Sequence, residues 1–154
     1  MADIRVRITG IDKVIRSFDR RIDGMEEALD EGCIEAAEYL QECIENKFGH
    51  YQKGWEHLKP ETISKKVGKG NGTNATKPLV DYGDMMFSFS IDTSNRTRKH
   101  TVAVTSDDPK IIHHVYGAPR AGVPKRDPMR PTAKEERQNC IDILIKKVKE
   151  LMNV

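Results

Sequence analysis

The chain has 154 residues, of which 32% are charged and only 6% are aromatic, and its formal net charge at pH 7 is +2. This length suits one domain, which we expect to span residues 1–154 around a core of aliphatic side chains. No stretch reaches the roughly 18 apolar residues of a membrane-spanning helix, and the polar start does not resemble a signal peptide, so we expect no membrane contact. The three cysteines form no CxxC pair, which argues against a disulfide framework and a thiolate zinc site.

The first third of the chain predicts a strand and two helices. Apolar and polar residues alternate over 4–8, which is typical of a half-buried strand. Apolar residues then recur at helical spacing over 11–18, and a longer apolar stripe predicts a second helix from about Met25 to about Lys47. The stretch from Gly24 to Asn46 carries eight acidic residues and no Lys or Arg.

The middle of the chain shows little apolar periodicity at first. Residues 65–77 are rich in Lys, Gly and Asn, and we expect them to form a mobile loop. A Walker loop needs Gly-Lys followed by Ser or Thr, and Gly68-Lys69-Gly70 lacks that hydroxyl, so nucleotide binding is not predicted. Apolar residues then alternate over 87–91 and over 101–105, which predicts an antiparallel hairpin linked by 92–100.

The last third predicts a strand, an arm and a helix. We expect a further strand over 111–116. Four prolines follow within 117–131, and because proline fixes its own φ and disfavours helix in the residue before it, we expect an extended arm there. Thr132-Ala-Lys-Glu135 matches a capping box and predicts the start of a C-terminal helix. Together the elements indicate an α+β fold: a small antiparallel sheet with helices packed on one face, among them a long N-terminal helix and a C-terminal helix.

The sequence predicts no catalytic residue, cofactor or metal ion. His113 and His114 are adjacent, so in a strand their side chains would point to opposite faces and could not share a metal. His50 and His57 lack the i,i+4 spacing of a zinc-protease helix. No Gly-x-Ser-x-Gly elbow and no cysteine signature of a nucleophile is present, so we expect that the protein is not an enzyme.

Charge is segregated along the chain. The acidic stretch before Asn46 contrasts with the segment from Lys110 to Lys149, which has ten basic residues against four acidic ones. One interpretation is that each run is the solvated face of its own element. The other is that the acidic and basic surfaces meet between copies of the protein, since complementary patches set the orientation of partners.

Three segments of the chain resemble a known family. They are Trp55-Glu-His-Leu58-Lys-Pro60-Glu-Thr62-Ile-Ser-Lys65, then Pro78-Leu79-Val-Asp81-Tyr82-Gly83-Asp-Met85, then Val115-Tyr116-Gly117 followed by Val123-Pro124-Lys125-Arg-Asp-Pro-Met129. In the same order they are similar to the W-x-x-L-x-P-x-T-x-x-x-K, P-L-x-D-T-G-x-L and "hxxG…iPaRPf" segments of phage virion-morphogenesis, or tail-completion, proteins. The sequence departs from that pattern at Tyr82, at Lys125 and over 127–129.

This resemblance implies a structural protein of the head–tail neck of a phage or prophage. Such a protein acts in tail completion, tail termination or head–tail joining as a subunit of a ring, typically of six copies. Its partners would be other copies of itself, the tail-tube protein and the head-connector protein. It would be found in the tail or neck of the virion, and in the host cytoplasm during assembly.

A ring of this kind uses heterologous interfaces, in which one patch meets a different patch on the next copy. The candidate interface residues are, in the arm, Arg120, Lys125, Arg126 and Arg130, and in the acidic helix, Glu35, Glu38 and Glu42. The candidate contacts to a neighbouring protein, or to DNA in a channel, are Lys65, Lys66, Lys69 and Lys77. We expect the 65–77 loop to become ordered on such contact.

The alternative from another class is a DNA-binding or DNA-processing phage protein. In that case the same four lysines would bind phosphate groups. The sequence pI of about 8.4 lies below that of most dedicated DNA-binding domains, and no recognition module is visible. Salt-dependent affinity for DNA would favour this alternative, whereas arm-dependent binding to tail or connector proteins would favour assembly.

Overall fold

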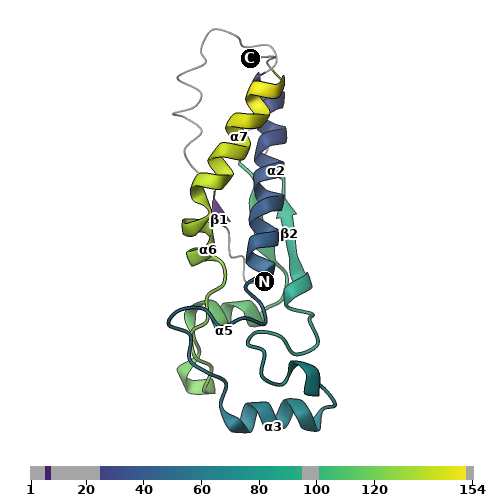
Figure 1. Cartoon of the computed structure of the whole chain (residues 1–154), viewed down its shortest axis with the longest axis vertical. Coiled ribbons are helices and arrows are strands. Elements are labelled where there is room, and N and C mark those ends of the chain that lie inside the picture. The colour runs from purple at the N-terminus through teal and green to yellow at the C-terminus, as the bar shows by residue number, and fades with distance from the viewer. Residues whose placement is uncertain (1–5, 8–24, 95–100, 152–154) are drawn as a thin grey trace.

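The structure, a computed structural model of the chain, describes residues 6–7, 25–94 and 101–151. Of the strand expected over 4–8, it shows β1 (Val6–Arg7). The helix expected over 11–18 and most of the expected hairpin link lie outside the described residues. The described part is elongated, with two long helices at one end and a lobe of shorter elements at the other (Figure 1).

Two long helices, α2 (Met25–Glu45) and α7 (Arg137–Leu151), form the body and lie side by side along the long axis (Figure 1). The predicted apolar stripe of α2 is confirmed, because most of it is buried where α2 meets α7. The buried residues include Ala28, Cys33, Ala36, Leu40 and Ile44 of α2, and Cys140, Leu144 and Val148 of α7. A Cβ added at Gly32 would lie 3.0 Å from Leu144 Cδ2, so glycine lets the two helices approach closely.

The predicted hairpin is confirmed as β2 (Phe89–Asp92) and β3 (Ala103–Ser106), which pair antiparallel with Phe89 opposite Ser106. β1 pairs with the other edge of β3, and the sheet order is β1-β3-β2. Side chains of α2, such as Leu40 and Ile44, share one core cluster with Phe89 and Val104. Phe87, expected in the strand, instead lies in the 3-10 turn η3 (Met86–Ser88), outside the sheet. The fold is therefore α+β, as the order of the predicted elements indicates.

The prediction of a mobile loop over 65–77 is wrong for most of this segment. The helix α3 (Pro60–Gly68) runs into it, and the turn η2 (Gly72–Asn74) follows. Pro60 begins the helix with the φ that a first turn needs. The ammonium group of Lys66 then holds the segment, because it donates hydrogen bonds to the carbonyls of Asn74 (3.2 Å), Lys77 (2.8 Å) and Val80 (2.5 Å).

The strand expected over 111–116 is also wrong, since these residues form the helix α5 (Lys110–Tyr116). Ile111 and Val115 are four residues apart and both are fully buried, so they lie on one face of a helix. The carboxylate of Asp108 accepts a hydrogen bond from the backbone N–H of Lys110 (2.8 Å) at the start of this helix. A short apolar run fits a strand or a helix equally well by pattern alone.

The extended arm expected over 117–131 is folded onto its own chain instead. Ala118 and Val123 form an antiparallel bridge around the turn η4 (Pro119–Ala121). Arg126 and Met129 are buried, with 4% and 0% of their surface exposed. The cause is packing, because Met129 belongs to the main hydrophobic core cluster and carries the preceding residues inward.

The capping box expected at Thr132 is wrong as well. The helix α6 (Arg130–Glu135) begins two residues earlier, and the hydroxyl of Thr132 donates a hydrogen bond to the carbonyl of Pro128 (2.7 Å). Asp127 supplies the acceptor that the free N–H groups need, since its Oδ1 accepts from the N–H groups of Met129 (2.9 Å) and Arg130 (3.1 Å). The predicted C-terminal helix itself is confirmed as α6 followed by α7.

Candidate binding site in the α3–α5 pocket

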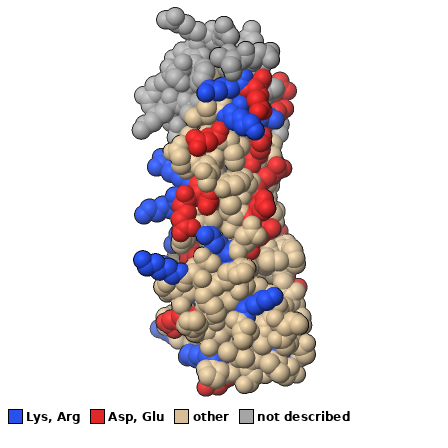
Figure 2. Space-filling model, viewed as in Figure 1, with Lys and Arg blue, Asp and Glu red and all other residues tan. Residues whose placement is uncertain are grey.

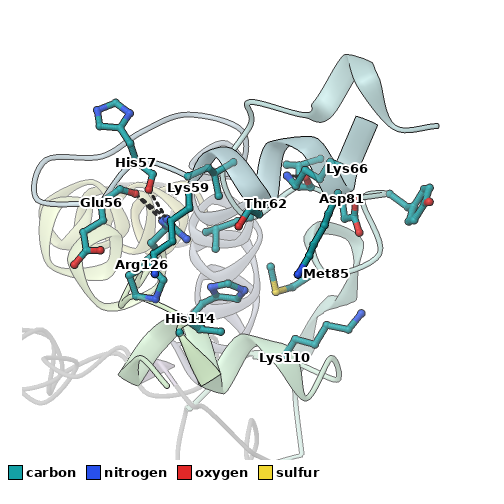
Figure 3. Close-up of a pocket in the computed structure, with 18 of the residues that line it drawn as sticks. Glu56, His57, Lys59, Thr62, Lys66, Asp81, Met85, Lys110, His114 and Arg126 are labelled. Carbon is teal, nitrogen blue, oxygen red and sulfur yellow. Dashed lines mark hydrogen bonds between the residues drawn. The ribbon is translucent and has the colours of Figure 1, made fainter. Parts of the chain in front are cut away.

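A pocket of about 460 Å³ lies in the lobe, between α3 on one side and α5 on the other. Its wall is built from three separate parts of the chain, residues 56–69, 79–85 and 122–126, together with Lys110 and His114 of α5 (Figure 3). These parts overlap the three segments that carry the family resemblance. Residues that are far apart in the sequence thus meet in one cavity.

Arg126 is the most deeply buried charged group of the pocket. Its Nε and Nη2 donate hydrogen bonds to the carbonyl of Glu56 (3.0 and 2.8 Å), and Nη2 also reaches the carbonyl of His57 at 3.3 Å (Figure 3). Burial lowers the pKa of Arg126, but a guanidinium remains charged in a protein. Among the described residues no carboxylate lies within ion-pair distance of Arg126, and its known acceptors are neutral carbonyls.

His114 lies beside Arg126 at the floor of the same pocket (Figure 3). Its Nδ1 is buried and has no hydrogen-bond partner among the described residues. The pKa of His114 is lowered to about 4, first because burial disfavours the imidazolium and then because Arg126 and His113 repel it. The ring is therefore neutral at pH 7, with an unsatisfied nitrogen in a cavity that already holds a buried cation.

Two of the predicted lysines hold the lobe together. Lys66 is committed to its three carbonyl acceptors, and burial lowers its pKa. Lys69 lies 3.7 Å from the carboxylate of Asp81, whose Oδ1 accepts a hydrogen bond from the amide of Asn71 (2.9 Å). The hydroxyl of Tyr82 closes the same corner by donating to the carbonyl of Lys69 (3.2 Å). Lys65 and Lys77 remain exposed.

The charged side chains that line the pocket are mostly basic. Its lining holds six basic side chains and three carboxylates. The basic ones are Lys59, Lys65, Lys66, Lys69, Lys110 and Arg126, and the carboxylates are Glu56, Asp81 and Asp84. Apolar side chains, including Leu79, Met85 and Val123, form the rest of the wall. The arrangement suits an anion that also carries an apolar group.

The predicted interface residues are not brought together within the chain. On α2, Glu35 lies 3.7 Å from Lys147 of α7, whereas Glu38 and Glu42 are exposed. Figure 2 shows acidic side chains along the body, with basic side chains among them and along one edge. The pairing of Arg126 with an acidic residue of another copy is contradicted, because Arg126 is buried in its own lobe.

The other basic residues of the predicted arm differ in their surroundings. Arg120 and Lys125 are exposed, at and just after the turn η4. Arg130 is exposed too, but its guanidinium stacks on the ring of Tyr116 at 4.5 Å, hydrogen-bonds to its hydroxyl, and lies 3.9 Å from Asp127. Arg120 and Lys125 are therefore freer than Arg130 to meet another molecule.

The residues that carry the resemblance have structural roles in the lobe. Trp55 is half-buried and packs against the main core, and the N–H of Leu58 donates to the hydroxyl of Tyr51 (3.0 Å). Gly83 has a φ of +100°, and an added Cβ there would lie 3.1 Å from the ring of Phe87. Gly117 has a φ of +79°, which other residues rarely adopt. Such roles explain why these residue types occur at these positions.

The sequence does not predict that His114 and Arg126 line the same pocket. The sequence pattern raises His114 as a metal ligand in a strand and Arg126 as a contact to another molecule. No local sequence pattern predicts this arrangement, because the backbone carbonyl that binds Arg126 belongs to Glu56, 70 positions earlier in the chain. The acceptors of Arg126 are backbone carbonyls, and because every residue has one, the sequence does not indicate which residues will accept.

Among the described residues, no group of three His, Cys, Asp or Glu side chains is placed to hold a metal ion. No described helix combines the length and the apolar composition needed to cross a membrane. The pocket itself brings together hydrogen-bond donors, cations and apolar side chains.

Comparison of the chain with models of protein families, with curated proteins and with solved structures finds no match.

Proposed function

We propose that this chain is a ring-forming structural subunit of the head–tail neck of a phage or prophage, with a role in tail completion, tail termination or head–tail joining. The observation that supports the proposal is the convergence of its three family-like segments on one lobe. Arg126 of the third segment binds carbonyls of Glu56 and His57 in the first. Lys66, which directly follows the first segment, binds the carbonyl of Val80 in the second.

The convergence matters because three short motifs could match a family by chance if they were unrelated in space. Here the segments lock one another through buried charged side chains and backbone carbonyls. A signature shared by a structural family is expected to mark positions of this kind. The role of these residues in the lobe is positional, which is consistent with a protein that assembles and does not catalyse.

The surface offers two unlike patches of the kind that a ring needs. One is the acidic face of α2, where Glu38 and Glu42 are exposed. The other is the turn with Arg120 and Lys125. A heterologous interface joins different patches of neighbouring copies, and opposite charges fix their orientation.

Large aromatic side chains are exposed in the lobe as well. Phe87, Tyr82 and Tyr116 have 73%, 61% and 59% of their surface accessible. Aromatic residues of this kind are enriched at protein interfaces. They support contact of the lobe with another protein.

The DNA-binding alternative gains less from the structure. It relied on four lysines in a mobile loop, but Lys66 is occupied by three carbonyls and Lys69 lies beside Asp81. Lys65 and Lys77 alone are a small footprint for phosphate binding. We therefore keep assembly as the proposed function.

Native mass spectrometry of the purified chain tests the ring. The expected result is a closed oligomer of a single size, which the double variant R120E/K125E shifts towards monomer while its circular dichroism stays unchanged. A matched control is K53E/K134E, which reverses two exposed charges elsewhere and should leave the oligomer intact. A chain that is monomeric at all concentrations, or an oligomer that R120E/K125E leaves unchanged, would contradict the proposal.

A further inference from the structure

We propose that the α3–α5 pocket binds an acidic peptide segment of another protein, with a carboxylate of that segment held over Arg126 and His114. The inference rests on the pocket alone and goes beyond the proposed function, since it holds whether or not the chain forms a ring. It concerns a peptide whose acidic residue has an apolar neighbour.

The first observation is a buried cation without an anion. Arg126 is 4% exposed, and its hydrogen-bond acceptors among the described residues are the neutral carbonyls of Glu56 and His57. A charge taken out of water is costly unless an opposite charge offsets the loss. The carboxylates of the pocket do not fill this role, because none lies within ion-pair distance of the guanidinium among the described residues.

The second observation is a buried nitrogen without a partner. Nδ1 of His114 is enclosed and makes no hydrogen bond to any described residue. Unsatisfied buried polar groups are rare in folded proteins and point to a missing partner. An imidazole nitrogen can donate to a carboxylate oxygen when it carries the proton. His114 and Arg126 therefore place two buried polar groups in the wall of one pocket, a nitrogen without a hydrogen-bond partner and a cation without a counter-charge among the described residues (Figure 3).

The rim adds long-range attraction for an anion. Lys59, Lys65 and Lys110 are exposed lysines on both sides of the opening. None of them is used to hold the lobe, although Lys110 lies 3.8 Å from Asp108. Cations arranged around a low-dielectric cleft raise the local concentration of anions and speed their arrival.

The wall of the pocket favours a peptide over a nucleic acid. Leu58, Leu79, Met85 and Val123 give it an apolar lining, which would hold a leucine- or valine-sized side chain next to the carboxylate. A site for single-stranded nucleic acid combines a continuous basic groove with aromatic platforms for the bases. Here one buried cation, Arg126, lies in a cavity with exposed lysines around its opening, and a volume of about 460 Å³ suits a few side chains.

The experiment uses the full chain and a panel of capped hexapeptides in which one Asp or Glu is flanked by Leu, Val or Phe. Each peptide has a copy with Asn or Gln in place of the acid. Binding is followed at constant pH 7 by the ¹⁵N shifts of the His114 ring and the Arg126 side chain, and by fluorescence anisotropy of labelled peptides. A twelve-residue oligothymidylate serves as the nucleic-acid probe.

Acidic members of the panel should shift the nitrogens of His114 and Arg126, and their neutral copies should not. The triple variant K59Q/K65Q/K110Q should weaken binding by about fivefold at low salt, because each exposed charge pair contributes modestly. The control K53Q/K134Q/K149Q removes three exposed lysines that do not line the pocket and should leave the affinity within about twofold. H114Q should weaken binding without unfolding the lobe.

Three results would overturn the proposal. Neutral copies that bind as tightly as the acidic peptides would show that the carboxylate is not recognised. Oligothymidylate that shifts His114 more strongly than any peptide would assign the pocket to nucleic acid instead. A panel that leaves the nitrogens of His114 and Arg126 unmoved would show that the pocket takes no acidic peptide.

Discussion

The body and the lobe of this protein are stabilised in different ways. In the body, α2 and α7 bury apolar stripes against each other, and the sheet packs on the same core. In the lobe, α3 has no buried residue and is held by Lys66, which reaches three carbonyls. The two long helices are therefore stabilised by many apolar contacts, whereas α3 and the residues that follow it are held by a few hydrogen bonds from charged side chains.

This difference suggests that the body provides most of the stability of the fold and that the lobe provides the binding surface. A tightly packed body keeps its shape without a partner. The lobe has a pocket and exposed aromatic side chains, and its helix α3 has no buried residue, so we expect a bound partner to stabilise this region more than the body. The following predictions test whether the two regions differ in this way, from the largest expected effect to the smallest.

Removing a core side chain should destabilise the whole body. Leu144 is 3% exposed and packs against α2 at Gly32, so L144A should lower the free energy of unfolding by about 2–5 kcal/mol. Urea denaturation followed by circular dichroism measures the change. The control K146A truncates an exposed residue of the same helix and should have little effect. An equally small effect of L144A would mean that α7 is not part of the core.

Acid should weaken the lobe through His114. Its pKa is about 4 in the folded chain and near 6.5 when it is unfolded, so between these values the unfolded chain binds more protons. Stability should therefore fall as the pH falls through this window, by up to about 3 kcal/mol, and change no further below pH 4 from this group.

The variant H114Q is the control for this acid effect, because glutamine does not titrate. The measurement is hydrogen exchange of lobe amides at a series of pH values, corrected for the intrinsic exchange rate. The wild-type chain should lose protection between pH 6.5 and pH 4, and H114Q should lose much less of it. Equal losses in the two proteins would mean that another group is responsible.

Removing the ammonium group of Lys66 should open the lobe and spare the body. K66M leaves three carbonyls without their donor, which should cost about 1–3 kcal/mol of local stability. Hydrogen exchange should rise over 60–81 and stay low over 28–44 of α2. The neighbouring K65M is the matched control, since Lys65 is exposed. A uniform rise over the whole chain would contradict the separation of lobe and body.

Removal of the surface ion pair between Lys47 and Glu135 should change the stability of the protein least. Lys47 lies 2.9 Å from Glu135 at the surface of the molecule. Exposed pairs contribute about 0.2–1 kcal/mol and less at high salt, so K47M should shift the urea midpoint only slightly. A large shift would mean that charge on the surface of the body is more important than its core.

The sequence predicts the body far better than the lobe. Long apolar stripes in α2 and α7 leave a strong periodic signal, and alternation in β2 and β3 leaves a clear one. The residues of α5 form too short a run for its period to decide between strand and helix. Ile111 and Val115 are compatible with either structure until the packing around them is known.

The pocket could not be predicted because tertiary contacts alone create it. Lys66 and Arg126 bind backbone carbonyls of distant segments, and a carbonyl is present at every residue. The prolines of 117–131 indicate an extended arm, but the apolar side chain of Met129 packs in the core and brings the preceding residues inward. The three segments that carry the family resemblance contribute to the wall of this pocket, but nothing in their sequence indicates that they meet.

The central proposal, a subunit of the head–tail neck, is tested most directly by electron microscopy of particles made when the coding sequence is deleted from the parent phage or prophage. The account predicts full heads that are not joined to tails, or tails of abnormal length, with normal particles restored by the wild-type gene in trans. Unjoined heads would indicate a joining role, and abnormal tails a terminating role. Normal, infectious particles from the deletion would contradict the proposal.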